Sequence, residues 1–455
     1  MLFVPGATGG AILRRRDMAR LPDPRFAPDC LVLVDGRAVP ARAGESVAEA
    51  LVAAGRPLLA RSAKYHRPRG PFCLAGSCGS CLVRVDGEPN RRACRTPCRD
   101  GLRVETQNAW PDAGHDLLAA IDLATPAGLD VHHLLTRPRA LNRVVVALAR
   151  RLAGLGRFPE AAGEPHPPVA EARVEALVLG AGPAGLGAAE ALARGGRRVL
   201  LAERDARPGG RLRATLGLPG DPPLAWADEV ASAVRVAGGE VALGAAAAGL
   251  WTDGGRPVCL LVAEGTHPSA RLVRADRVVV CTGGAAQPPV FENADVPGVF
   301  SGRALALALA EHGVVPGRRA AVLGTGPEAA GVAARLRAAG MEAFGVPGEV
   351  RRARGRSRVR ALVLADGSDL ACDTVVQGAP PAPVPELLRA LGVGVDWDAA
   401  AGAFVPRVGA DGTTAVPGLL AAGEAARPVG AAEAASWGRR AGQAALRTAT
   451  GTRGG

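Results

Sequence analysis

Two short stretches near the start of the chain alternate between hydrophobic and polar positions and predict β-hairpins. Residues 31–39 alternate around an Asp-Gly pair at 35–36, and residues 81–94 alternate around a second pair at 86–87. An Asp-Gly pair between two alternating runs is typical of a two-residue hairpin turn, because both residues tolerate positive φ angles. The two hairpins indicate a small antiparallel sheet.

A helix is predicted between these hairpins. Ser46 precedes an apolar run at helical spacing, Glu49 stands where a capping box needs its acid, and Gly55 follows the last apolar position. Hairpins and helix together predict a compact α+β domain over 28–106, after an N-terminal tail over 1–27.

The rest of the chain follows a different pattern. One amphipathic helix is expected at Leu141–Leu155, and a stretch rich in Pro, Gly and Glu follows it, so we interpret 107–170 as a helical linker. From residue 171 to the end, apolar strands alternate with helices. That alternation predicts an α/β fold with a parallel sheet.

The composition fits a globular protein and argues against a nucleic-acid partner. The 455 residues are 48% hydrophobic, and the formal net charge is +12. Aromatic residues make up only 3%, whereas binding to nucleic acid usually combines a basic surface with stacking aromatics. We therefore interpret the charge as a compositional bias toward arginine that still suits anionic cofactors.

The chain is expected to lie in the cytoplasm. No uncharged apolar run reaches the ~18 residues of a membrane span, and the start lacks the basic segment and cleavage site of a signal peptide. The sequence from Met18 looks like a natural opening. We therefore expect that translation begins at Met18 or that residues 1–17 are disordered.

The cysteine spacing predicts an iron–sulfur cluster. Five of the nine cysteines fall between Cys73 and Cys98, which indicates metal ligation in a reducing compartment rather than a disulfide scaffold. Cys73-x4-Cys78-x2-Cys81, followed by x12 and Cys94, is the plant-type spacing for a [2Fe–2S] cluster. A zinc site is disfavoured, because paired short Cys-x2-Cys knuckles are absent. The predicted ligands are Cys73, Cys78, Cys81 and Cys94, with Cys98 as a bystander.

A glycine-rich turn after a buried strand predicts a dinucleotide site. Gly180-x-Gly182-x-x-Gly185 joins this strand to a helix, and the next strand ends at Glu203. Gly180 would make the turn, Gly182 would admit a pyrophosphate, and Gly185 would let helix and strand pack closely. Glu203 is expected to accept hydrogen bonds from the adenosine ribose.

Three later segments favour FAD over NAD at this turn. Residues 207–212 resemble the glycine pair near the FAD pyrophosphate in the flavin class of this fold, and residues 277–284 resemble its returning strand and Thr-Gly turn. Glu424 stands where that class usually has an Asp beside the ribityl chain. The predicted FAD contacts are Gly180, Gly182, Pro183, Ala184, Gly185, Glu203, Arg204, Gly209, Gly210, Arg211, Thr282, Gly283, Gly423 and Glu424.

A second glycine-rich turn, at Gly324 and Gly326, also joins a strand to a helix. In two-dinucleotide flavoproteins an insertion of this kind holds NAD(P)H. No acid ends the strand at 341–346, so the insertion is expected to be truncated. The arginine run at 351–358 could meet a 2′-phosphate or form a solvated face, and the residues therefore leave NAD(P) binding open.

With features in this order, the chain resembles the α-type subunits of heteromeric sarcosine oxidase and of related amine, hydroxyproline and opine dehydrogenases. The resemblance spans nearly the whole chain and rests on residues 61–70, 150–160, 180–192, 289–300 and 423–424. The long sarcosine oxidase α subunits lack the cluster cysteines and continue into a folate-binding domain. This chain keeps all four cysteines and ends at Gly455, which favours the shorter dehydrogenase type.

The resemblance implies an α/β fold, with a two-dinucleotide-type FAD domain and a truncated NAD-like insertion behind a small α+β ferredoxin-like domain. The predicted domains are a tail over 1–27, a [2Fe–2S] domain over 28–106, a linker over 107–170, the FAD domain over 171–315, the insertion over 316–370 and the rest of the FAD domain over 371–455.

The resemblance also implies that a separate β-type FAD-dependent subunit oxidises the amine, while this chain relays electrons between FAD and the cluster. Two alternatives stay open, a self-contained NAD(P)H-dependent flavin and iron–sulfur reductase and a cofactor-bearing scaffold without turnover. No catalytic base is predicted. A disulfide reductase is disfavoured, because no Cys-x-x-Cys pair lies beside the second glycine turn.

Overall fold

The computed structural model describes residues 19–62, 65–120, 138–152, 168–263 and 269–447. Met18 and most of the predicted tail lie outside the described residues. The chain divides into two compact units, which we describe separately. Unit 1 comprises Met1–Gly163 and Pro288–Ala379, and unit 2 comprises Glu164–Gln287 and Pro380–Gly455.

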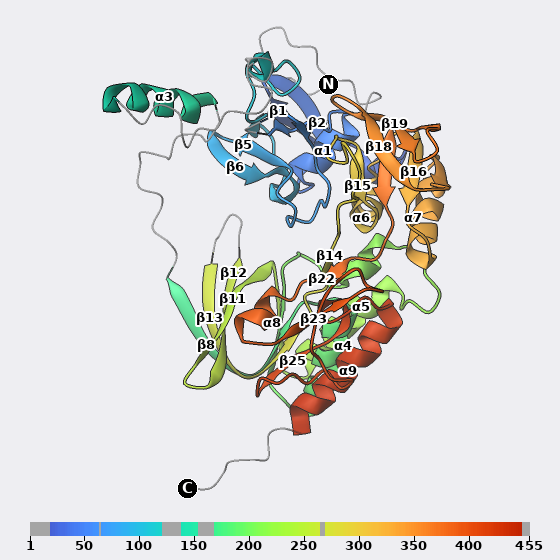
Figure 1. Ribbon diagram of the computed structural model, residues 1–455. Helices are drawn as coiled ribbons and strands as arrows, with labels where there is room; N and C mark the ends of the chain where they lie inside the picture. The colour runs from blue at the N-terminus through green and yellow to red at the C-terminus, as the bar shows by residue number, and fades with distance from the viewer. Residues whose placement is uncertain (1–18, 63–64, 121–137, 153–167, 264–268, 448–455) are drawn as a thin grey trace. The chain divides into compact units, whose positions relative to one another are not determined.

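The first segment of unit 1 is the predicted ferredoxin-like sheet with its helix (Figure 1). Five strands pair in the order β2-β1-β7-β5-β6. Both predicted hairpins are confirmed, and both of their Asp-Gly turns have positive φ angles. The elements are β1 (Cys30–Val34), β2 (Arg37–Ala41), α1 (Val47–Ala53), β3 (Ala60–Arg61), β4 (Pro68–Arg69), β5 (Leu82–Val85), β6 (Glu88–Arg92), β7 (Arg103–Glu105) and α3 (Arg139–Leu152).

The predicted capping box starts helix α1. The Ser46 side chain accepts a hydrogen bond from the Glu49 backbone N–H, and the Glu49 carboxylate accepts one from the backbone N–H of Ser46. Gly55 follows with a φ of +67°. The apolar side of α1 is buried against the sheet and forms one core with strand residues such as Val32 and Val83.

The second segment of unit 1 contains the second glycine turn. Four parallel strands pair in the order β15-β21-β16-β17, and β18, β19 and β20 form a separate antiparallel meander. Strand β17 lies at the edge of its sheet and leads directly into β18. The elements are β15 (Val299–Ser301), α6 (Gly302–His312), β16 (Arg319–Leu323), α7 (Pro327–Ala338), β17 (Glu342–Gly345), β18 (Val350–Gly355), β19 (Val359–Leu364), β20 (Asp369–Ala371) and β21 (Thr374–Gln377).

The two segments of unit 1 pack on each other. The backbone N–H of Ser301 donates to the Phe72 carbonyl at 2.9 Å, and a side chain at Gly70 would collide with Pro297. Residues 288–315, which we expected in the FAD domain, belong to unit 1, where β15 pairs with β21, a strand that follows the predicted insertion. The predicted domain boundaries themselves stay predictions.

Unit 2 is built on a long twisted sheet of order β10-β9-β8-β13-β12-β11, with β25 paired to β13. Strands β8, β9, β10, β13 and β25 run parallel where they pair, as the alternating pattern predicts. The elements are β8 (Val169–Leu179), α4 (Pro183–Arg194), β9 (Val199–Glu203), α5 (Leu224–Val236), β10 (Glu240–Leu243), β11 (Ala245–Asp253), β12 (Arg256–Ala263), β13 (Ser269–Val280), β14 (Gly284–Ala285), β22 (Ala382–Pro383), α8 (Glu386–Ala390), β23 (Val395–Asp398), β24 (Ala403–Pro406), β25 (Leu419–Ala421) and α9 (Ala431–Arg447).

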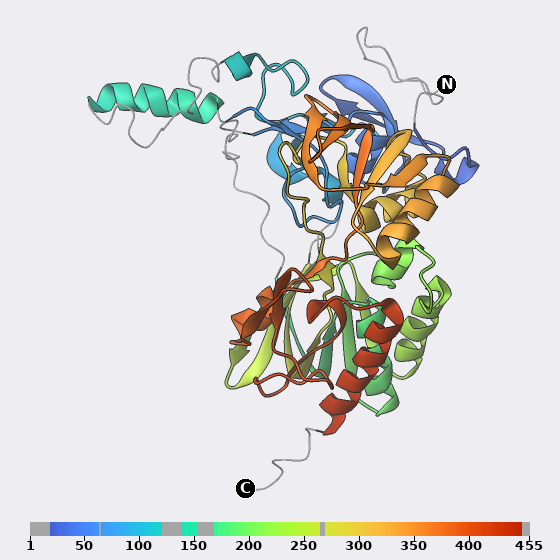
Figure 2. The same ribbon diagram turned by 45° about the vertical axis from the view of Figure 1, so that its right-hand side comes forward.

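The two faces of the parallel strands bury different cores. Ala176 and Val178 of β8 pack with α4, α5 and α9, whereas Leu177 and Leu179 pack with β12, β13 and α8. Figure 2 shows the red helix α9 beside the green helices of this layer. The last four residues of β8 are all buried, which explains why this end of the strand is continuously apolar.

The predicted linker helix is present as α3, and the part of that prediction beyond Leu152 lies outside the described residues. Its side chains Leu141 and Val144 are exposed. Among the helices in the described ranges, none has the length and apolar character needed to cross a membrane.

Candidate cofactor sites

The loop that precedes β5 in unit 1 brings the four predicted cluster ligands together. Cys73, Cys78 and Cys81 lie on this loop, and Cys94 lies on the short turn after β6. Gly76 has a φ of +81°, and a Cβ there would lie 2.9 Å from the Arg95 side chain. Glycine is therefore needed at this point of the loop.

The sulfur atoms are in mutual contact. The Sγ atoms of Cys81 and Cys94 are 3.3 Å apart. Two sulfurs bound to one tetrahedral metal at about 2.3 Å would lie roughly 3.8 Å apart, so this pair needs little movement to share one iron. The Sγ of Cys73 accepts hydrogen bonds from the backbone N–H groups of Ala75 and Cys78, both at 3.4 Å.

The thiols also influence one another's protonation. Hydrogen bonds from Cys78 and then Cys94 hold the pKa of Cys73 below its ordinary value. Contact with Cys73 raises the pKa of both Cys78 and Cys94. A hydrogen bond with Cys94 also lowers the pKa of Cys81, so the four side chains form one connected group of thiols. Cysteine thiolates are the ligands that iron–sulfur clusters use.

The four predicted ligands supply the number of thiolates that a [2Fe–2S] cluster uses. Within the described ranges, no group of three or more His, Cys, Asp or Glu side chains is placed to hold a metal ion. Cys98 is buried in the domain core, where burial and then Glu45 raise its pKa. This environment agrees with the bystander role predicted for Cys98.

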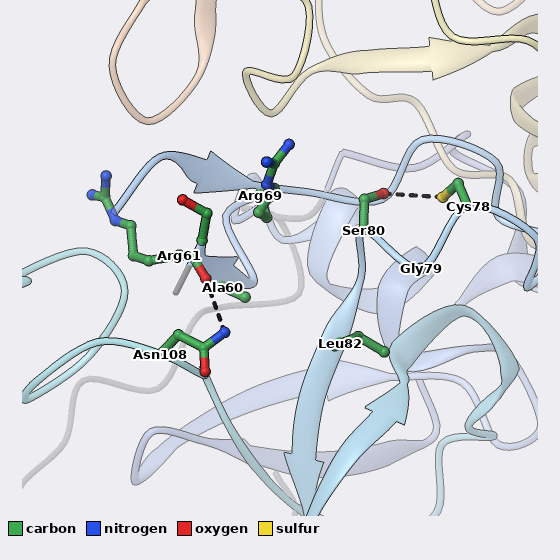
Figure 3. A pocket seen from close by; sticks show the side chains of 9 residues that line it. Ala60, Arg61, Arg69, Cys78, Gly79, Ser80, Leu82 and Asn108 are labelled. Atoms are coloured by element: carbon green, nitrogen blue, oxygen red, sulfur yellow. Dashed lines mark hydrogen bonds between the residues drawn. The ribbon is translucent and has the colours of Figure 1, made fainter. Parts of the chain in front are cut away.

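A pocket of about 390 Å³ opens beside the cysteine loop (Figure 3). Cys78, Gly79 and Ser80 line one side, and Arg61 and Arg69 of the short β3–β4 hairpin lie across from them. The Ser80 hydroxyl and the Cys78 Sγ are 3.0 Å apart. Of the four predicted ligands only Cys78 is exposed.

The first glycine turn in unit 2 has the shape that a pyrophosphate needs. Gly180 has a φ of +99°, and a Cβ there would lie 2.4 Å from the Cys281 carbonyl oxygen. A Cβ at Gly185 would lie 1.7 Å from the Gly180 carbonyl oxygen, so helix and turn approach closely. Gly182 caps α4, Pro183 is its first residue, and nothing but Gly210 lies within 4 Å of a Cβ at Gly182. A cradle is therefore open at the helix N-terminus.

Glu203 ends β9 beside this turn, as predicted. Its carboxylate accepts hydrogen bonds from the backbone N–H groups of Ala181, at 2.7 Å, and Asp205, at 2.9 Å. Burial raises its pKa above the ordinary value. A carboxylate has about four acceptor positions, so two remain for ribose hydroxyls.

The remaining predicted FAD residues of unit 2 fall into two groups. Gly209 and Gly210 face the turn, since the Gly209 N–H donates to the Ala181 carbonyl at 2.8 Å. Arg211 and Glu424 form a buried ion pair at 3.1 Å, and the Arg211 guanidinium also donates to the Val429 carbonyl. The direct partner of Glu424 is thus an arginine, a contact that the sequence did not indicate.

Three further predicted residues have simpler surroundings. Gly423 has a φ of +72°, and a Cβ there would lie 2.7 Å from the Ala184 side chain. Thr282 is exposed just after β13, and Gly283 follows with a φ of +76°. Arg204 is half-exposed and lies 3.7 Å from Asp205.

The second glycine turn, in unit 1, is less suited to a nucleotide. Gly324 and Gly326 are exposed with positive φ angles, and Gly326 caps α7. However, Glu328 is buried in the first turn of α7 and forms a two-bond ion pair with Arg303. A carboxylate in the first turn of a helix competes with an anionic ligand for its positive end. The edge strand β17 also ends without an acid for the ribose.

Sequence reasoning missed the residues that surround the cysteine loop. Arg61 donates to the backbone carbonyls of Ala113 and His66, and His66 pairs with buried Asp116 at 2.6 Å. The guanidinium of Arg92 donates to the Gly76 carbonyl at 2.8 Å. Arg61 and His66 lie in the segment 61–70 that carries the resemblance, but Ala113, Asp116 and Arg92 lie outside any recurring motif, so only the structure reveals these contacts.

Two protein families match the two parts of the chain. Residues 31–109 match the 2Fe-2S iron-sulfur cluster binding domain, and residues 174–351 match the pyridine nucleotide-disulphide oxidoreductase family. These matches assign a [2Fe–2S] cluster and FAD to the chain as cofactors, and the residues described above fit both groups.

Individual relatives agree with this division. Sarcosine oxidase subunit alpha of Rhizobium meliloti (strain 1021) is 33% identical over 332 residues, which are 69% of this chain and 33% of that protein. Hydrogen cyanide synthase subunit HcnA of Pseudomonas aeruginosa is 44% identical over 85 residues, which are 19% of this chain and 81% of that protein. This chain therefore spans about a third of the sarcosine oxidase subunit and most of HcnA.

A solved structure shows the same fold. The crystal structure of L-proline dehydrogenase from P. horikoshii superimposes with a TM-score of 0.71 at 21% identity, covering 92% of this chain and 73% of that chain. The fold, the two family matches and the long sarcosine oxidase alignment agree with one another. The chain is thus an FAD-dependent oxidoreductase in which a [2Fe–2S] domain is fused to an FAD domain, and over 69% of its length it is similar to sarcosine oxidase subunit alpha.

Proposed function

We propose that the chain is the electron-relay subunit of a heteromeric FAD-dependent amine or amino-acid dehydrogenase or oxidase. The observation that carries the proposal is the presence of two different redox sites in one chain, a four-cysteine loop in unit 1 and a dinucleotide turn in unit 2. FAD exchanges two electrons and a [2Fe–2S] cluster exchanges one, so together they turn a two-electron oxidation into single-electron steps.

The roles proposed for individual residues follow from the geometry. Cys73, Cys78, Cys81 and Cys94 would bind the two irons as thiolates. Three features would hold FAD: the open turn at Gly182 would receive the pyrophosphate, Glu203 would accept from the ribose, and the buried Arg211–Glu424 pair would lie toward the ribityl chain. The cytoplasm is the proposed location, because none of the nine cysteines, all within the described residues, forms a disulfide.

A β-type FAD-dependent subunit is the proposed partner, and it would carry out the amine chemistry. The described FAD turn has glycine, glutamate and arginine around it but lacks a lysine or histidine base of the kind that amine oxidation uses. The exposed apolar residues Leu141 and Val144 of α3 are suited to an interface. The resemblance to sarcosine oxidase alpha supports the same division of labour.

The proposal is tested by comparing the chain alone with the chain co-expressed with a flavoprotein encoded nearby. Dye reduction is measured with sarcosine, proline, hydroxyproline and opines as substrates. Turnover only in the complex is expected. A Cys78→Ser complex serves as control, because it should still reduce flavin with substrate and lose reduction of one-electron acceptors. Robust turnover by the chain alone would contradict the proposal.

One observation favours the alternative of a self-contained NAD(P)H reductase. Gly324 and Gly326 form an exposed turn at the N-terminus of α7. The buried Glu328–Arg303 pair and the acid-free end of β17 argue against it. Rapid bleaching of the bound flavin by NADH or NADPH in stopped flow would establish this alternative. A scaffold role would require a flavin that substrate in the complex cannot reduce.

A further inference from the structure

The cysteine loop of unit 1 has one open edge, and that edge lies at Cys78. Cys73, Cys81 and Cys94 are 1–6% exposed, whereas Cys78 is exposed and lines the pocket of about 390 Å³. A group that enters this pocket touches a predicted cluster ligand. The pocket therefore offers a short path for an electron between the cluster and a bound partner.

The far wall of the pocket is positively charged. Arg69 lies 2.8 Å from Asp295, and Arg67 shares the same carboxylate at 3.4 Å. Arg61 donates to two backbone carbonyls, and its neighbour Asp116 is already paired with His66. The three arginines thus have only two carboxylates nearby, Asp295 and Asp116, and Asp116 is already paired with His66.

A further arginine extends this charge beyond the pocket. Arg356 lies between β18 and β19 and is exposed. Burial lowers the pKa of Arg61, Asp116 opposes this, and the charge of Arg356 lowers the pKa further. Because Arg67 and Arg69 contact Asp295 of the second segment of unit 1, the charged surface extends over both segments and is wider than a small anion needs. A surface of this width is suited to a macromolecule that carries negative charge.

The arginines are held in place by buried contacts rather than lying loose on the surface. His66 and Asp116 pair at 2.6 Å with side chains that are 7% and 2% exposed, and they anchor the loop of the β3–β4 hairpin. The Asn108 amide donates to the Arg61 carbonyl at 3.0 Å (Figure 3). A preorganised site loses less entropy when a partner binds.

We propose that this arginine-rimmed pocket docks an acidic electron-carrier protein, with a surface carboxylate entering between Arg61 and Arg69 next to Cys78. The inference rests on the proposed electron-relay function and names the partner that receives electrons from the cluster at Cys78. One electron passes from the reduced cluster to the oxidised carrier, and no covalent bond forms or breaks. The arginines supply attraction and orientation, so their contribution should weaken as salt screens the charges.

The test measures binding to the protein loaded with both cofactors, independently of turnover. An oxidised acidic flavodoxin is the probe, and a basic cytochrome c is the comparison protein. The flavodoxin should bind, with affinity that falls as ionic strength rises, and the cytochrome should bind more weakly. Arg356→Glu and Arg61→Gln should each weaken flavodoxin binding about tenfold at low salt, as loss of a charged interface contact does. Arg235→Glu, an exposed arginine of α5 in unit 2, is the matched control and should change little.

The outcomes separate this inference from the proposed function. Unchanged flavodoxin affinity in Arg356→Glu, with intact cluster absorption, would overturn the docking site, even if Arg61→Gln failed to fold. If Arg356→Glu weakened assembly with the β-type subunit and left the affinity for flavodoxin unchanged, this result would also overturn the docking site. It would assign the pocket to the subunit interface. Turnover by the chain alone would instead contradict the proposed function, while charge-dependent flavodoxin binding would still support the docking site.

Discussion

At the scale of single residues, the four cysteines of the loop differ from Cys98 in their surroundings rather than in their chemistry. Cys78 lies in contact with other thiols, whereas Cys98 is packed in the core near Cys30 and Glu45. Substitution therefore affects the two positions differently.

Cys78→Ser is expected to abolish the cluster, because a serine hydroxyl at neutral pH does not replace a thiolate ligand. Cys98→Ser should keep about two irons per chain. Iron content and the visible absorption of anaerobically purified protein measure the difference. Equal loss of iron from both variants would refute the ligand assignment.

Glu203 makes FAD binding depend on pH. Its pKa lies above the ordinary value of 4.5 because the side chain is buried, so acid protonates it earlier than an exposed glutamate. Protonation removes an acceptor from the ribose hydroxyls, and FAD affinity should fall as the pH drops through this raised pKa. Fluorescence of released FAD measures the effect.

Glu203→Gln is the control for that titration. It should bind FAD about tenfold or more weakly at pH 7, since a hydrogen bond to a charged group contributes about 1.5–3 kcal/mol. The affinity of Glu203→Gln for FAD should also not decrease as the pH falls. The same pH profile in both proteins would show that another group controls FAD release.

At the scale of elements, the contact between α4 and α9 holds the FAD turn in position. A Cβ at Gly438 of α9 would lie 1.9 Å from the Ala184 carbonyl oxygen, and one at Gly187 of α4 would lie 2.3 Å from the Ala435 carbonyl oxygen. The helices therefore touch through their backbones. Because Ala184 lies in the first turn of α4, displacement of α9 should move the turn that receives the pyrophosphate.

Gly438→Ala is expected to destabilise unit 2 by about 1–3 kcal/mol or more, as overpacking of a close contact does, and to weaken FAD binding. Gly430→Ala is the matched control, since a Cβ there meets nothing within 4 Å. Thermal unfolding with and without added FAD compares the two. Equal melting temperatures would contradict the packing argument.

At the scale of the whole molecule, unit 1 is assembled from two segments distant in sequence. Arg20 bridges them, because its guanidinium pairs with buried Glu45 at 2.6 Å and donates to the His312 carbonyl at 2.8 Å. Arg42 contacts His312 from the same side. The ferredoxin-like segment and helix α6 of the second segment therefore share a buried polar contact.

Arg20→Ala should destabilise unit 1 by about 3–5 kcal/mol, because it leaves a buried carboxylate unpaired. Burial already raises the pKa of Glu45, and Arg20 partly opposes that rise. The loss of stability in Arg20→Ala is therefore full at pH values above the pKa of Glu45 in the folded variant. It disappears as Glu45 takes up a proton at lower pH. The melting temperature of Arg20→Ala should lie well below the wild-type value at pH 7 and should approach it at mildly acidic pH. Arg37→Ala, at an exposed position, should show no such recovery.

The sequence by itself determined those features whose signals act over a few residues. The Asp-Gly turns, the Ser46–Glu49 capping box, the glycine turn at Gly180 and the cysteine spacing each specify a local backbone shape. Turn and cap preferences are satisfied within one segment. For that reason the ferredoxin-like sheet, the first FAD strand with its helix, and the four candidate ligands were all predictable.

Only the tertiary structure decided which distant residues meet. Arg211 and Glu424 are 213 positions apart, Arg20 and His312 are 292 apart, and Arg61 and Ala113 are 52 apart. Such contacts depend on how sheets and helices pack, and local hydrophobic periodicity contains no record of them. Only the fold therefore showed that residues 288–315 belong to unit 1, that α4 and α9 approach closely, and that a charged pocket lies at Cys78.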